Sequence, residues 1–453
     1  MKITAVLLAA GQGTRMKSDL PKVLHPLCGK PMIWHVLEAL KEAATEPPVV
    51  VVGHGAGAVT EYLGDSARTV LQKPQLGTAH AAMQAESLLR GKTDLVILTY
   101  ADMPLLRGET FRRLVDAQRL NPGPLSLLTV IADDPRGFGR IVRKPDGTVQ
   151  AIVEEYVATP EQQKIKELNV GAYCFNAEWL WEALKRIEKN PKKGEYYLTD
   201  VVEIAVRDNL PVQAVLHDDF IETIGINTRV HLSEAEAAMR ARLNRDLMLN
   251  GVSMRDPAST YIDAGVKIGR DTILMPNTFI HGNTVIGERN VIGPNTIIRD
   301  TTIGNGCKIL ASVLEGAVLE DEVDIGPFAR LRKGAHLKSH VHMGNFGEVK
   351  DSVLHEGVKM GHFSYIGNAV IGANTNIGAG TITCNYDGEK KHPTTIGRDV
   401  FIGSDTMLVA PLTLGDGART GAGAVVTKDV PEDTLVVGMP ARAIRKLERK
   451  KKG

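Results

Sequence analysis

The chain has 453 residues, which is too many for one hydrophobic core of ordinary size, so two or three domains are expected. Apolar residues make up 43% of it, which excludes a disordered chain, and the net charge of +1 gives no reason to expect nucleic acid or a membrane as a partner. The four cysteines form no CxxC pair, which argues against a disulfide framework or a zinc site and is typical of a cytoplasmic protein.

Apolar strands and amphipathic helices alternate through the first half of the chain. The expected strands are residues 3–10, 48–52, 95–99, 139–142, 149–153 and 170–175, and the expected helices are residues 32–44 and 79–89. This alternation predicts a Rossmann-like α/β domain with a parallel or mostly parallel sheet, whose ligands bind beyond the carboxyl ends of the strands. We interpret the first apolar run as a buried strand rather than a signal peptide, because a Gly-rich, cationic loop follows it.

Residues 230–249 have a different composition, rich in Ala, Glu, Arg and Leu, and predict one exposed helix. We interpret this helix as a connection between two domains. The predicted organisation is therefore a first domain of residues 1–228, a linker helix of residues 229–249 and a second domain of residues 250–453.

Beyond the linker, aliphatic side chains recur every six residues. The first series is Ile268, Leu274, Ile280, Ile286, Ile292 and Ile298, and after phase slips it continues as Ile303, Ile309, Val313, Leu319, Ile325 and Leu331. A helix would need a spacing of 3.6 residues and a half-buried strand a spacing of two. A period of six predicts short strands that each turn a corner, with one aliphatic side chain per corner pointing into a narrow prism. Such hexapeptide repeats specify a parallel β-helix.

The sharpest local motif follows the first strand, in residues 8–16 with the sequence LAAGQGTRM. It lacks the GK[ST] ending of a Walker loop and the third glycine of a Rossmann fingerprint. Gly11 and Gly13 would let backbone N–H groups approach phosphate oxygens, while Arg15 and Lys22 would supply positive charge for a triphosphate. From the residues alone, a phosphate site and a Gly-rich turn with surface charges are equally favoured.

This motif, LAAGxGTRM followed by Pro-Lys, resembles the signature of the sugar-phosphate nucleotidyltransferases. Further matching segments follow in order at Gln72, 76–78, 102–105, 137–141, Glu154, 169–171, 195–200 and 225–227. Together with the hexapeptide half, the chain resembles the bacterial family that joins N-acetylglucosamine-1-phosphate uridylyltransferase to glucosamine-1-phosphate N-acetyltransferase. The resemblance implies a left-handed β-helix and the synthesis of UDP-N-acetylglucosamine from glucosamine 1-phosphate, acetyl-CoA and UTP.

For the first domain the resemblance implies that Asp102 and Asn227 hold Mg²⁺, an ion that prefers oxygen donors. Lys22 and Arg15 would stabilise charge as the sugar 1-phosphate attacks the α-phosphorus of UTP. Contacts with UTP and the UDP-sugar are implied at Leu8, Ala9, Ala10, Gly11, Lys22, Gln72, Gly77, Thr78, Ala101, Gly139, Glu154, Asn169 and Asn227. Ala101 departs from the family, which usually has glycine there, and alanine disfavours a positive φ.

In the second domain the six-residue rhythm is expected to break around His362 and again at residues 383–388, and interruptions of a solenoid often carry function. The pKa range of histidine suits it to deprotonate an amine, so His362 is the candidate general base, with Glu348 as a residue that could orient it. The resemblance implies sugar-phosphate contacts at Arg332, Lys350, Tyr365 and Asn376. It also implies acetyl-CoA contacts at Ala379, Asn385, Tyr386, Ser404 and Ala422.

The resemblance further implies a homotrimer, with the acyl site in the cleft between neighbouring prisms. Met439 stands where one branch of the family has arginine, which leaves the contacts at the far end of CoA open. The basic tail at residues 445–452 is expected to be solvated, although it could attract CoA phosphates.

Two other interpretations stay open. A single-activity pyrophosphorylase of the ADP-glucose or GDP-mannose type could carry a regulatory β-helix, but such β-helices lack the combination of His362 with the Asn385-Tyr386 pair. Some translation-factor exchange subunits pair the same two folds as scaffolds, and the presence of Lys22, Asp102 and Asn227 argues against that interpretation.

Overall fold

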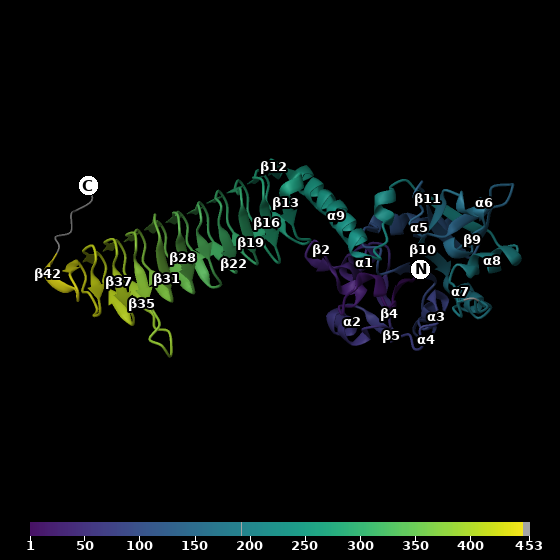
Figure 1. Ribbon diagram of the computed structural model, residues 1–453, viewed down its shortest axis with the longest axis horizontal. Coiled ribbons are helices and arrows are strands. Elements are labelled where there is room, and N and C mark those ends of the chain that lie inside the picture. Colours follow the sequence, from purple (N-terminus) through teal and green to yellow (C-terminus); the bar gives the residue numbers. More distant parts are fainter. Residues whose placement is uncertain (192, 447–453) are drawn as a thin grey trace. The chain divides into compact units, whose positions relative to one another are not determined.

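The structure of the chain, a computed structural model, describes residues 1–191 and 193–446 and contains two compact units that divide between residues 239 and 240 (Figure 1). Helix α9, Arg229–Leu249, spans this division and has the bounds predicted for the linker helix. The predicted domain boundaries enclose this helix, whereas each compact unit takes part of it. Most of the basic tail at residues 445–452 lies outside the described residues. Among the described residues, no helix is long and apolar enough to cross a membrane.

The first unit is built on a nine-stranded sheet whose main path has the order β11-β7-β10-β6-β1-β4-β5, with β8 and β9 extending from β10. The bounds of these strands are Ile3–Ala9 for β1, Glu46–Val52 for β4, Arg68–Leu71 for β5, Leu95–Tyr100 for β6, Leu125–Ile131 for β7, Arg140–Arg143 for β8, Val149–Val153 for β9, Glu167–Asn176 for β10 and Val212–His217 for β11. On the main path only β10 is antiparallel to its neighbours, β6 and β7. The prediction of a mostly parallel sheet is confirmed.

Helices cover both faces of this sheet, which explains why β1 is buried at every position and is apolar apart from Thr4. Val6 and Leu8 pack with the helices on one face, and Ala5 and Leu7 pack with those on the other. The first set is α3 (Thr78–Met83), α4 (Glu86–Leu89), α7 (Ala177–Leu184) and α8 (Asp200–Arg207), and the second is α1 (Met32–Leu40), α2 (Ala56–Leu63) and α5 (Gly108–Leu120). The helix expected at residues 79–89 is therefore two short helices, α3 and α4.

The second unit is a three-sided coil of short parallel strands, a left-handed β-helix (Figure 1). Its first face runs from β12 (Ser253–Met254) to β42 (Arg442–Lys446), its second from β13 (Thr260–Ile262) to β40 (Val425–Val426), and its third from β14 (Lys267–Ile268) to β38 (Leu412–Leu414). Consecutive strands of the chain belong to consecutive faces, so each strand from β12 to β37 pairs with the strand three places further along. At the end of the coil β39 (Arg419–Thr420) pairs with β41 (Thr434–Val437), and β41 pairs with β42 in antiparallel orientation. Buried threonines add hydrogen bonds between coils: the Thr272 hydroxyl donates to the Gly287 carbonyl at 3.0 Å and accepts from the Asn290 amide at 3.2 Å.

One column of buried aliphatic side chains fills the coil and confirms the period of six. Two details of the predicted register are wrong. At the second phase slip, after Ile309, Leu314 is fully buried while Val313 is partly exposed, because the repeats before and after Leu314 have five residues instead of six. The rhythm also does not break at His362, since Met360 and Ile366 fill the column on either side of it. The predicted interruption at residues 383–388 is confirmed, because the chain between β34 (Ile382–Cys384) and β35 (Thr394–Ile396) leaves the coil as a projecting loop (Figure 1).

Candidate functional site

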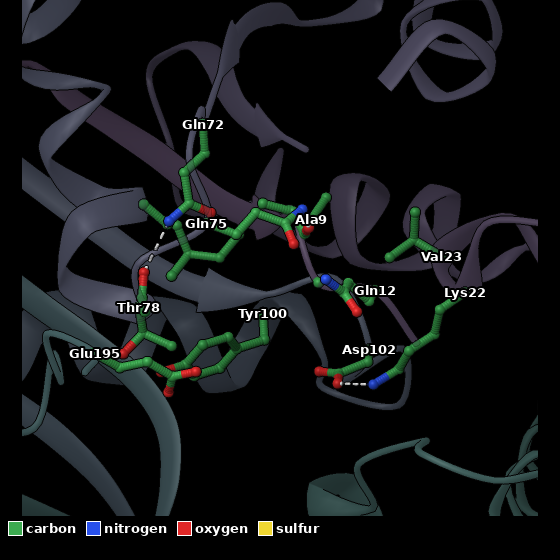
Figure 2. A pocket seen from close by; sticks show the side chains of 15 residues that line it. Ala9, Gln12, Lys22, Val23, Gln72, Gln75, Thr78, Tyr100, Asp102 and Glu195 are labelled. Carbon is green, nitrogen blue, oxygen red and sulfur yellow. Dashed lines mark hydrogen bonds and ion pairs between the residues drawn. The ribbon is translucent and has the colours of Figure 1, made fainter. Parts of the chain in front are cut away.

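The loop after β1 brings two cations beside the predicted metal-binding pair. The Lys22 ammonium lies 2.5 Å from Asp102 Oδ2 and 2.8 Å from Asn227 Oδ1, and Arg15 donates to the same Asn227 oxygen at 2.9 Å. Figure 2 shows Lys22 and Asp102 facing each other at one end of the pocket. Gly13 makes this possible, because its φ is +62° and a Cβ there would lie 2.7 Å from Lys22 Cβ.

Asp102 and Asn227 are held together by the backbone as well as by Lys22. Asp102 follows β6, Asn227 lies just before α9, and the Ile226 amide donates to the Asp102 carbonyl at 2.9 Å. A carboxylate and an amide oxygen around one point are donors that suit Mg²⁺, which keeps several waters and takes further ligands from substrate phosphates. Among the described residues no group of three or more His, Cys, Asp or Glu side chains could hold a metal. The pair therefore fits an ion that depends on its substrate for part of its coordination.

A cavity of about 440 Å³ lies beyond the carboxyl end of β1 and β6, where a parallel sheet is expected to bind its ligand. Nine of its lining residues are among the predicted site residues: Leu8, Ala9, Ala10, Gly11, Lys22, Gln72, Gly77, Thr78 and Asp102. The sequence did not single out Gln12, Gln75, Tyr100 or Glu195, which also line it. Gln12 and Glu195 belong to segments that carry the family resemblance, whereas Gln75 and Tyr100 are found only from the fold.

The amide of Gln72 has a fixed orientation at the end of the cavity opposite Lys22 (Figure 2). Its Nε2 donates to the Gly77 carbonyl at 2.9 Å and lies 3.2 Å from His80 Nδ1. With the donor side of the amide occupied, Gln72 Oε1 is left as the acceptor for a ligand. Gly77 has a φ of +103°, and a Cβ there would lie 2.5 Å from the Tyr196 carbonyl, so the turn requires glycine.

The residues expected to hold the sugar do not line this cavity, but they lie near its Tyr100 end. Glu154 accepts from the Thr199 hydroxyl at 3.0 Å, and burial raises the pKa of its carboxyl. Burial also raises the pKa of Tyr100, and the nearby charge of Glu154 adds to that effect. Asn169 is buried, donates to the Tyr173 hydroxyl at 2.7 Å, and its backbone amide donates to the Gly139 carbonyl at 2.9 Å.

In the second unit a groove of about 640 Å³ gathers five of the predicted acetyl-transfer residues: His362, Asn376, Ala379, Ser404 and Ala422. It lies along the first face, over β30 (Lys359–Met360), β33 (Asn376–Ile377) and β36 (Phe401–Ile402), and along the turns that follow those strands. The sequence missed Lys359 and Phe401, which also line the groove. Met439 is 78% exposed and does not line it.

The other predicted acetyl-transfer residues lie on or beside the second face. Arg332 follows β25 (Arg330–Leu331), and Lys350 ends β28 (Gly347–Lys350). Tyr365 lies in β31 (Ser364–Gly367), which pairs with β28 and places Tyr365 beside Glu348. Glu348 accepts from Arg332 at 2.9 Å, and no hydrogen bond joins it to His362 in the described part of the chain.

The projecting loop adds a cation that sequence reasoning missed. The neighbouring ammonium of Lys350 lowers the pKa of Lys391, with a smaller contribution from Arg332. Asn385, at the base of the loop, donates to Asn368 at 2.7 Å, while Tyr386 is exposed. The run Lys390-Lys391 was a possible signal, but no repeat spacing connects an inserted loop to Lys350.

The predicted sugar contacts therefore lie on two faces of one prism. Lys350 and Tyr365 are in strands of the second face, whereas Asn376 is in a strand of the first. Their outward side chains point in different directions, so one chain does not bring them together around a single sugar.

Comparison with known proteins gives matches to both units. Residues 5–166 match the MobA-like NTP transferase domain, and residues 265–300 and 393–428 match the bacterial transferase hexapeptide repeats. Proteins named Bifunctional protein GlmU are similar over nearly the full length. The one from Geobacillus sp. (strain WCH70) is 47% identical, covering 98% of this chain and 97% of its own. The one from Stutzerimonas stutzeri (strain A1501) is 48% identical with coverage of 97% and 96%, and the one from Listeria monocytogenes is 43% identical with coverage of 95% and 94%.

Proposed function

The chain belongs to the family of bifunctional GlmU proteins, and from that membership we propose how its two sites make UDP-N-acetylglucosamine. It is an enzyme with two transferase activities. The β-helix transfers an acetyl group from acetyl-CoA to glucosamine 1-phosphate, and the first unit then transfers a uridylyl group from UTP to the product with release of pyrophosphate. The observation that carries this function is the match to bifunctional relatives over 95–98% of the chain, through both units.

Uridylyl transfer depends on position and charge, because the substrates supply both the nucleophile and the leaving group. A phosphate oxygen of N-acetylglucosamine 1-phosphate forms the new bond to the α-phosphorus of UTP, and the bond from that phosphorus to pyrophosphate breaks. Lys22 and Arg15 lie where they would stabilise this negative charge. Gln72 Oε1 would accept from the uracil N–H, and Glu154 and Asn169 would bind the sugar.

A divalent metal is required for this kind of transfer, and we identify it as Mg²⁺ from the hard oxygen donors of Asp102 and Asn227. When bound, the ion neutralises phosphate charge. Lys22 bonds both oxygens, so its positive charge lies beside the point where the ion and the phosphates would bind.

Acetyl transfer requires the amino group of glucosamine 1-phosphate to lose a proton. His362 would take it, the amine would form a bond to the thioester carbonyl carbon, and the carbon–sulfur bond would break to release CoA as its thiol after proton return. Arg332, Lys350 and Lys391 form a cluster of cations for the sugar phosphate. The groove with Ala379, Ser404 and Ala422 would hold acetyl-CoA, with Asn385 and Tyr386 as further contacts.

A homotrimer would complete the acetyl-transfer site, since the faces that carry Lys350 and Asn376 diverge within one chain. Closed rotational symmetry would place the second face of one prism against the first face of its neighbour. Phe328 and Phe346 are exposed in the turns that connect the first face to the second, and their rings stack 5.5 Å apart. They are apolar surface that a neighbouring prism would cover. We place the enzyme in the cytoplasm, where UTP and acetyl-CoA are available and the thiols of Cys174, Cys307 and Cys384 stay reduced.

The test is an assay with glucosamine 1-phosphate, acetyl-CoA, UTP and Mg²⁺ that follows CoA thiol and pyrophosphate separately. Release of both is the expected result. His362→Ala should lower CoA release about a hundredfold or more and spare pyrophosphate release from ready-made N-acetylglucosamine 1-phosphate. Asp102→Ala should lower pyrophosphate release and spare CoA release. If the wild type releases no CoA, and releases pyrophosphate only when N-acetylglucosamine 1-phosphate is supplied ready-made, the single-activity interpretation is favoured.

A further inference from the structure

Glu222 is a buried carboxylate with no place in the reaction described above. Its side chain is 4% exposed, and the residue lies in the short 3₁₀ helix Phe220–Thr223. One oxygen receives an ion pair from Arg107 Nε at 2.7 Å. The other accepts from the Thr110 hydroxyl at 2.7 Å and from the Arg107 backbone amide at 3.2 Å, with His217 Nε2 3.4 Å away.

These contacts join the two segments that carry the metal-binding pair. Arg107 lies five residues after Asp102, at the start of α5, and Glu222 lies five residues before Asn227. The same two segments meet again at the hydrogen bond from the Ile226 amide to the Asp102 carbonyl. Glu222 therefore forms a second connection between them, away from the pocket.

The charge of Glu222 matters to this connection. Burial alone would raise the pKa of its carboxyl, but the neighbouring His217 imidazole and the hydrogen bonds from Thr110 and the Arg107 backbone amide outweigh burial and hold the pKa below its ordinary value. The group is thus a carboxylate surrounded by donors. An amide of the same shape would place N–H groups against the guanidinium or the hydroxyl and would lose part of the connection.

We propose that Glu222 is a positioning residue that sets the separation of Asp102 and Asn227 for the divalent cation. The inference rests on the proposed function of that pair. Groups that orient metal ligands from behind typically change metal affinity by about 10- to 100-fold when they are removed. Glu222 acts through the backbone of both segments, so its loss should weaken cation binding more than it slows the reaction once the cation is bound.

The experiment compares Glu222→Gln with the wild type as full chains. Mn²⁺ binding with UDP-N-acetylglucosamine present is measured by electron paramagnetic resonance, and the Mg²⁺ concentration for half-maximal pyrophosphate release is measured in parallel. We expect both constants to rise about tenfold, with kcat at saturating Mg²⁺ within about threefold of the wild type. Acetyl transfer by the β-helix of the same chain should not change, and the nearly unchanged kcat for pyrophosphate release reports that the first unit is folded.

The matched control is Asp219→Asn. Asp219 lies on the same segment and approaches the same arginine, at 3.8 Å, but it is 42% exposed. The Asp219→Asn variant should therefore have the Mn²⁺ affinity of the wild type. If Glu222→Gln does not fold, Thr110→Val removes only the hydroxyl donor and should give a smaller weakening of the same kind.

Unchanged Mn²⁺ affinity in Glu222→Gln, or an equal weakening in Asp219→Asn, would overturn the positioning role and leave the proposed function intact. A wild type that binds no Mn²⁺ and needs no Mg²⁺ would instead overturn the metal site, and this inference with it.

Discussion

At the scale of single residues, Ala101 is the position where the family resemblance led us to expect glycine. Its φ is not positive, its amide donates to the Leu8 carbonyl at 3.0 Å, and its side chain is fully buried. We therefore predict that Ala101→Gly lowers the free energy of unfolding by about 1 kcal/mol and changes uridylyl transfer by less than about threefold, since glycine adds chain entropy and removes a buried methyl group. Urea unfolding and steady-state kinetics measure the two effects. A large loss of rate with no loss of stability would contradict the prediction.

Asp200, the first residue of α8, gives a pH-dependent prediction at the same scale. Burial, with Glu203 and Glu154 nearby, raises the pKa of its carboxyl to about 6 from an ordinary value of 3.8. Its ionisation therefore opposes folding, and this penalty develops as the pH rises from 3.8 through 6. Asp200→Asn should raise the free energy of unfolding by about 1 kcal/mol at pH 7 and by much less at pH 4. Urea unfolding at both pH values is the measurement, and an equal gain at both would exclude the ionisation as its cause.

At the scale of the elements, Leu314 and Val313 test the register of the β-helix. Leu314 is fully buried in the column of the coil, whereas the neighbouring Val313 is partly exposed. We predict that Leu314→Ala lowers the free energy of unfolding by about 2–5 kcal/mol and Val313→Ala by less than about 1 kcal/mol. Thermal or urea unfolding of the two full-length variants measures the difference. The register predicted from the six-residue spacing gives the opposite order.

The same element shows what a sequence pattern can predict. The period of six predicts the coil, because every six-residue segment repeats one geometry, and the apolar strand at residues 3–9 predicts a buried sheet. A repeat of five residues cannot be seen in that pattern, since both Val313 and Leu314 are aliphatic and either could continue it.

The sequence analysis missed Lys391 and Glu222 for another reason. Their roles depend on partners 41 and 115 residues away along the chain, Lys350 and Arg107, and no local spacing marks such contacts.

At the scale of the whole molecule, the two proposed reactions depend on different parts of the protein. The cavity of the first unit forms within one chain, because the loops after β1, β5 and β6 supply the predicted nucleotide contacts, and Asp102 after β6 meets Asn227 before α9 as the predicted metal-binding pair. The acetyl-transfer residues instead occupy two faces of the β-helix. If the chain assembles as we propose, dissociation into single chains should abolish acetyl transfer while leaving uridylyl transfer, because only a symmetric neighbour would complete the acetyl-transfer site.

Mixed assemblies test this separation directly. Lys350→Ala and Asn376→Ala each alter one face, so assemblies of either variant alone should have very little acetyl transfer. If each site joins the second face of one chain to the first face of a neighbour, co-assembly in equal amounts leaves about a quarter of the sites with both side chains intact, and CoA release should recover to about a quarter of the wild-type rate. Mixing after assembly, without exchange of chains, is the control and should restore nothing. Failure of co-assembled chains to recover would mean that Lys350 and Asn376 act on a sugar from within one chain, which the divergence of β28 and β33 onto different faces opposes.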